Sequence, residues 1–65
     1  MMKQRFDKKV DELNNYQFKQ WIEANCVWYN NSVEPYYLYK PTRLKYYTCE
    51  YLYDDYLNRY KKLNY

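Results

Sequence analysis

Two prolines divide the middle of this chain, in the stretch VEPYYLYKPTRLKYY at residues 33–47. Pro35 and Pro41 each lack an amide donor and bias the preceding residue toward extended geometry, so one continuous helix cannot pass through the stretch. Its tyrosines and its threonine favour strand geometry. We therefore predict an irregular or short-strand connection over residues 33–47, with helices before and after it.

Apolar residues before this connection recur at helical spacing. Phe6 and Val10 are four residues apart, and the next apolar residue follows three positions later, which predicts an amphipathic helix over residues 3–13. A second stripe, which contains both tryptophans, predicts a helix over residues 16–29. Asn14 is a plausible N-cap for this second helix, because a glutamine follows it three residues later.

The residues after the connection show the most regular helical pattern. Thr48 is a favourable N-cap, and Glu50 in the first turn complements the helix dipole. Apolar residues then recur every three or four positions, which predicts a helix over residues 48–63. Cys49, close to the start of this helix, would have a somewhat acidified thiol. The predicted fold is mainly α: one small three-helix domain over residues 1–65.

Length and composition limit the core that this chain can build. A domain of 65 residues buries only about 60% of the surface that its unfolded chain exposes. Leu, Ile, Val and Phe are few beside 12 Tyr and two Trp, so the core must be built largely from Tyr and Trp, and some rings must stay exposed. The absence of Gly and the abundance of Lys, Asn and Tyr are typical of an AT-rich genome, such as that of a low-GC bacterium, a phage or a mobile element.

Several classes of function are disfavoured by composition. The formal net charge of +3 does not fit a strongly acidic DNA mimic. The chain has no His and no Gly-rich phosphate loop, and its two cysteines are too few for a structural zinc site. We therefore predict a non-enzymatic protein with no catalytic residues, no cofactor and no metal. No apolar run of about 18 residues and no signal-peptide pattern is present, which predicts a cytoplasmic protein that does not bind a membrane and whose cysteines are reduced.

The sharpest functional signal is a basic tyrosine stretch at residues 36–47, which contains three cations and no acid. Rings that stack on unpaired bases, beside cations that contact phosphates, are what a single-stranded nucleic-acid binder needs. The alternative is that these tyrosines simply pack in the core or in an interface. The predicted nucleic-acid-binding residues are Tyr36, Tyr37, Tyr39, Tyr46 and Tyr47 for stacking, and Lys40, Arg43 and Lys45 for phosphates.

Two segments resemble a known family. Residues 18–27, FKQWIEANCV, and residues 50–60, EYLYDDYLNRY, resemble in that order paired helices in the C-terminal winged-helix region of phage, plasmid and poxvirus primase-helicases. The resemblance implies a trimmed winged-helix-like fold and a role in replication on a mobile element. It does not imply helicase activity, because this sequence contains no ATPase module, and it stops soon after the second segment, where a recognition helix and wing would follow.

Together these features predict an accessory protein of DNA replication or maintenance in a phage or mobile element. Its partners would be single-stranded DNA, a replication protein such as a polymerase or helicase, or a second copy of itself. The predicted partner-binding residues lie on the last helix: Tyr51, Tyr53, Tyr56 and Tyr60. The alternatives are a small phage-type inhibitor or adaptor that binds one protein through a Tyr-rich face without touching nucleic acid, and an obligate oligomer whose tyrosines complete a shared core.

Overall fold

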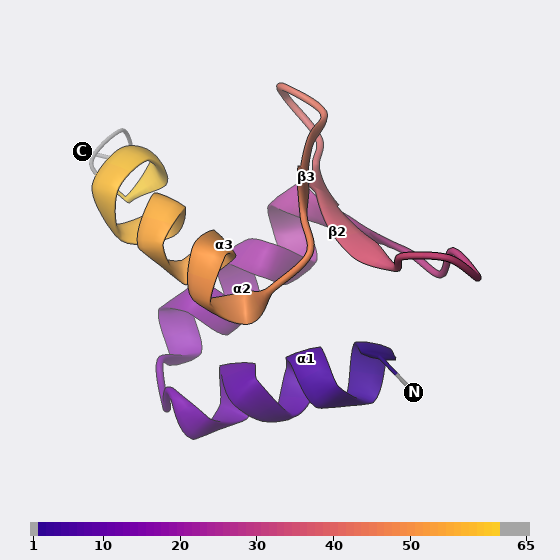
Figure 1. The fold of residues 1–65 in the computed structure, drawn as a ribbon. Helices are drawn as coiled ribbons and strands as arrows, with labels where there is room; N and C mark the ends of the chain where they lie inside the picture. The colour runs from indigo at the N-terminus through magenta and orange to yellow at the C-terminus, as the bar shows by residue number, and fades with distance from the viewer. Residues whose placement is uncertain (1, 62–65) are drawn as a thin grey trace.

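Three helices pack against a small antiparallel sheet in the computed structural model, which describes residues 2–61 (Figure 1). The elements in chain order are α1 (Met2–Glu12), α2 (Tyr16–Asn25), β1 (Cys26–Tyr29), β2 (Tyr36–Tyr39), β3 (Leu44–Tyr46), α3 (Cys49–Asp55) and a π-helical turn, η1 (Tyr56–Tyr60). The predicted class, a mainly helical three-helix domain with short strands within 33–47, is confirmed. The arrangement is compatible with a small winged-helix-like domain.

The start of each later helix is fixed by a side-chain cap. The Thr48 hydroxyl accepts a hydrogen bond from the Tyr51 amide, as predicted for the N-cap of α3. The predicted cap of α2 is wrong by one residue, because Asn15 accepts from the Phe18 amide at 3.0 Å. Asn14 instead has a φ of 53° and turns the chain between α1 and α2. Asparagine tolerates this left-handed conformation better than most residues.

The second helix is shorter than predicted, because its expected last residues form β1. The amide of Cys26 still bonds to the Ile22 carbonyl, but Cys26 itself is extended, with φ −121° and ψ 155°. Val, Trp and Tyr, which favour strands, follow it. Strand β2 then supplies a complete antiparallel partner, with Cys26 opposite Tyr39 and Tyr29 opposite Tyr36. Pairing with a distant segment therefore decides the conformation of these four residues.

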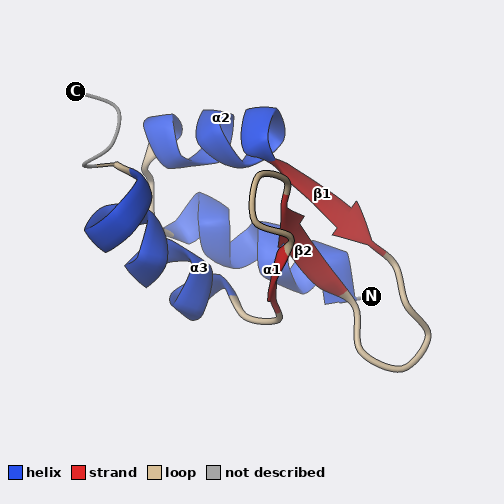
Figure 2. Ribbon diagram, turned by 90° about the horizontal axis from the view of Figure 1, so that it is seen from above, coloured by secondary structure: helices blue, strands red, loops and turns tan. Residues whose placement is uncertain are grey.

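The strands form a meander in the order β1-β2-β3. In Figure 1 the two connecting loops extend from opposite ends of the sheet, and in Figure 2 β1 leads directly out of α2. Residues 40–43 make the tight turn between β2 and β3, in which the Arg43 amide bonds to the Tyr39 carbonyl at 2.8 Å. Arg43 has a φ of 62°, a left-handed geometry that four-residue turns commonly require at one position.

The core lies between the helices and one face of the sheet. Phe18, Tyr46 and Leu52 are its most deeply buried large side chains. Four of the eleven buried core residues that the structure describes are tyrosines, and both tryptophans pack at the edge of the core, so the expected core of mainly Tyr and Trp is only partly found. Aromatic contacts of this kind stabilise beyond the area they bury.

The last helix does not continue as a regular α-helix. It widens after Asp55 into η1, where the Lys61 amide bonds to the Tyr56 carbonyl five residues earlier at 2.7 Å. The hydroxyls of Tyr46 and Tyr60 are 2.6 Å apart, and Tyr46 donates to the Asp55 carboxylate at 2.7 Å. Because Tyr46 has one proton to donate, Tyr60 must donate to Tyr46. Residues 62 and 63 of the predicted helix lie outside the described residues.

Candidate nucleic-acid interface

The sheet has one face against the helices and one face turned away from them. Alternate strand residues point to opposite faces, and Tyr37, Tyr39 and Tyr46 pack toward the core. The intervening residues point the other way. We call this second surface the outer face; it consists of Val27, Tyr29, Tyr36, Leu38, Lys45 and Tyr47.

Three tyrosines form a row across the outer face. The rings of Tyr29 and Tyr36 are stacked, with centroids 5.3 Å apart and planes 11° apart. The ring of Tyr47, directly after β3, meets Tyr36 edge-on with a centroid distance of 5.4 Å. Tyr29 is 45% exposed and Tyr47 is 40% exposed. This tyrosine row therefore presents aromatic surface to solvent from β1, from β2 and from the residue that follows β3.

Positive charge accompanies the tyrosine row. The Lys45 ammonium lies 5.1 Å from the centroid of the Tyr36 ring, a cation–π contact. Lys40 and Arg43 are exposed on the turn at the opposite end of the sheet, where the Lys40 ammonium donates to the Ala24 carbonyl at 3.3 Å. Within the described residues, no carboxylate lies at ion-pair distance from any of these three cations. The strands themselves contain no acidic residue, so an anion meets no opposing charge within the sheet.

The structure divides the predicted stacking residues between the two faces. Tyr36 and Tyr47 lie on the outer face, as stacking requires. Tyr37 and Tyr46, at 8% and 1% exposure, lie in the core, and their prediction as base-stacking residues is wrong because a buried ring has no free surface. Tyr39 is half-buried, and its ring contacts Tyr60 at 4.1 Å, so it also belongs to the core side.

The tyrosines predicted to bind a protein partner through α3 are mostly structural. Tyr56 and Tyr60 are 4% and 7% exposed, so the prediction is wrong for both: they pack inside the domain. Tyr53 is half-buried against Phe18, with ring centroids 4.8 Å apart. Only Tyr51, at 56% exposure, presents most of its ring to solvent. One exposed ring on α3 is a much smaller surface than the predicted contact.

Sequence reasoning missed half of the outer face. The sequence pattern predicts a helix over Val27 and Tyr29, and it does not distinguish Leu38 from its tyrosine neighbours. The missed signal is the period-two alternation of β1, which places Cys26 and Trp28 inward and these residues outward. Alternation over four residues is too short to distinguish a strand from the end of a helix.

The two cysteines are structural. Burial raises the pKa of Cys26 to about 12 and that of Cys49 to about 11. The predicted acidified thiol at Cys49 is therefore wrong, because desolvation outweighs any effect of the helix start. Among residues 2–61, no group of three or more potential metal ligands is assembled.

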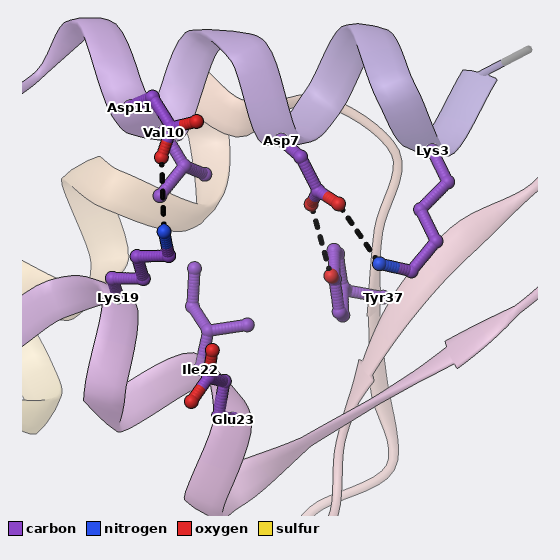
Figure 3. A pocket seen from close by; sticks show the side chains of 8 residues that line it. All are labelled: Lys3, Asp7, Val10, Asp11, Lys19, Ile22, Glu23 and Tyr37. Carbon is purple, nitrogen blue, oxygen red and sulfur yellow. Dashed lines mark hydrogen bonds and ion pairs between the residues drawn. The ribbon is translucent and has the colours of Figure 1, made fainter.

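A hollow of about 230 Å³ lies between α1 and α2 and is a further candidate ligand site (Figure 3). Asp7 accepts hydrogen bonds from the Lys3 ammonium at 2.8 Å and the Tyr37 hydroxyl at 3.2 Å. Across the hollow, Lys19 pairs with Asp11 at 3.2 Å. Most of its polar groups are thus bonded to one another, and its volume is below the range typical of small-molecule sites. The outer face is the stronger candidate.

No helix in the described part of the chain is both long and apolar enough to cross a bilayer. No protein-family model, curated protein or solved structure matches this chain. Its function is therefore inferred from the physical chemistry of the outer face.

Proposed function

We propose that this protein binds single-stranded nucleic acid through the outer face of its sheet, as a non-enzymatic accessory protein of DNA replication or maintenance. The observation that carries the proposal is the tyrosine row beside Lys45, on a sheet without acidic residues. Unpaired bases stack on exposed rings with little dependence on sequence, and nearby cations contact the phosphates.

The dimensions of the outer face suit a short single-stranded segment. Three neighbouring strands place the tyrosine row across about 10 Å, and aromatic residues on the surface of a sheet commonly stack two or three bases. A duplex keeps its bases paired and stacked, so it offers the rings no base surface. We therefore infer a preference for single strands without base-specific recognition.

The proposed replication role rests on the two segments that resemble helices of primase-helicases, and these segments are neighbours in the fold. Residues 18–27 form most of α2 and the first half of β1, and residues 50–60 span α3 and η1. They pack on each other, with the Phe18 and Tyr56 rings 4.9 Å apart and the Trp21 and Tyr60 rings 5.0 Å apart. Both segments thus lie mainly on the core side of the sheet, and Val27 is their one residue on the outer face.

Protein recognition is the second candidate function, and exposed aliphatic residues favour it. Val33, at the loop between β1 and β2, is 88% exposed, and Val27 on the outer face is 39% exposed. Together with the tyrosine row, they would suit an inhibitor or adaptor that binds one protein. Such an interface needs no phosphate contacts, so its affinity would depend little on salt.

Salt dependence tests the proposed function. Three cations that each neutralise one phosphate should give a log–log slope of affinity against salt near −2, from about 0.7 per phosphate on a single strand. Fluorescence anisotropy with a labelled oligothymidylate measures this slope. Lys45→Gln should reduce it by about 0.7, whereas Lys8→Gln, on the solvent side of α1, should not change it. A flat salt response, no binding at low salt, or tighter binding of a duplex of equal length would refute the proposal.

A further inference from the structure

A groove of about 300 Å³ begins where the tyrosine row ends. It runs between α1 and the segment that joins β3 to α3, and Tyr47 belongs to both the row and the groove. Arg5 and Lys9 line it from α1, and Thr48 and Glu50 line it from the opposite side. The groove therefore continues the outer face beyond β3.

Two cations from α1, Arg5 and Lys9, line the groove. Arg5 is exposed, and none of the described carboxylates lies at ion-pair distance from it. Lys9 bonds to the Glu50 carboxylate at 2.7 Å. Both partners of this ion pair are at least half exposed, with side chains 50% and 66% accessible, so water screens their attraction and a competing anion can replace Glu50 at little cost.

We propose that this groove is a phosphate-binding extension of the outer face. A single strand stacked on the tyrosine row would continue past Tyr47, and its next phosphates would contact Arg5 and then Lys9 as Lys9 leaves Glu50. The inference rests on the proposed function, and it adds the direction in which a bound strand leaves the sheet. Continuity with the tyrosine row favours nucleic acid over an acidic peptide as the occupant, because a peptide would need the cations but not the rings.

Glu50 then acts as a competing negative charge in the groove. It holds Lys9 when no strand is bound, and it repels phosphates when a strand enters. Removing its charge should therefore strengthen binding, an effect opposite to that expected if the residue only supported the fold.

Oligonucleotides of two lengths separate the groove from the sheet. One of about three thymidines covers the tyrosine row, and one of about eight also reaches the groove. For the longer oligonucleotide at low salt, Arg5→Gln should weaken binding about threefold and Glu50→Gln should tighten it by a similar factor. Neither substitution should change binding of the shorter one. Lys8→Gln and Glu23→Gln make the same charge changes elsewhere on α1 and α2. For both oligonucleotides, these control variants should change the affinity only by the small amount that the altered net charge causes.

The outcomes distinguish this inference from the function on which it rests. If neither oligonucleotide binds, the proposed function fails and the groove inference fails with it. If both bind, but the longer one is no tighter and the groove variants behave as their controls do, the groove inference is wrong and the proposed function stands. If Glu50→Gln instead tightens binding of poly-glutamate and not of the longer oligonucleotide, the groove binds an acidic peptide and the inference is also overturned. Circular dichroism of each variant checks that the fold is retained.

Discussion

Replacing Tyr29 and Tyr36 together with alanine should lower affinity for a single-stranded oligonucleotide by at least about 30-fold. Stacking on one aromatic ring contributes about 1–3 kcal/mol per base, so the loss of two rings removes at least about 2 kcal/mol. These rings are the stacked pair of the tyrosine row. Both lie on the outer face, away from the core cluster, so the fold should survive. Anisotropy titration at low salt measures the change.

A matched control uses tyrosines that are exposed but lie outside the row. Tyr16 on α2 and Tyr51 on α3 are 70% and 56% exposed, and their double alanine variant should bind as the unmodified protein does. Phenylalanine at positions 29 and 36 should retain most of the affinity, because stacking uses the ring and not the hydroxyl. Equal loss of affinity in the control variant, or native affinity after removal of both row tyrosines, would contradict the proposed role of the row.

The second large effect concerns stability. Phe18→Ala should destabilise the protein by about 3–5 kcal/mol, because it removes a fully buried aromatic ring and leaves a cavity. Phe18 is 0% exposed, and its ring contacts Trp21, Tyr53 and Tyr56. A domain of this length has a free energy of unfolding of about 3–10 kcal/mol, so the variant should be largely unfolded or close to it. Urea denaturation followed by circular dichroism measures the loss.

Tyr16→Ala provides the comparison for Phe18→Ala, since it shortens another aromatic side chain on the same helix. Tyr16 is mostly exposed, so its replacement should change the free energy of unfolding by no more than about 0.5 kcal/mol. If the Phe18→Ala variant has the same urea midpoint of unfolding as the unmodified protein, the core is not centred on α2 as described.

The helices could be predicted because each has its own local signal. Phe6 and Val10 fix the buried side of α1, and the Thr48 hydroxyl fixes the start of α3. The end of α2 could not be predicted in the same way. Residues 26–29 fit a helical stripe and a strand equally well, and only their pairing with residues 36–39 makes them a strand. The conformation of residues 26–29 is therefore decided by a contact between two segments and not by their own sequence.

The sequence predicts where in the chain the candidate site lies, but not which residues form it. The basic tyrosine stretch does form part of the outer face, yet which of its rings face outward depends on the strand register. A shift of one residue would exchange Tyr36 for Tyr37. Tyr29 joins the row because it is paired with Tyr36, although seven positions separate them in the sequence. Local composition cannot reveal such a partner.

Nuclear magnetic resonance titration with an unlabelled oligothymidylate tests the central claim most directly. The account predicts that the largest chemical-shift changes map to the outer face, at Val27, Tyr29, Tyr36, Leu38, Lys45 and Tyr47. Exposed residues of α2 such as Lys19 and Gln20 should change little. Shift changes confined to the helices, or none at low salt and high protein concentration, would contradict binding of single strands by the outer face.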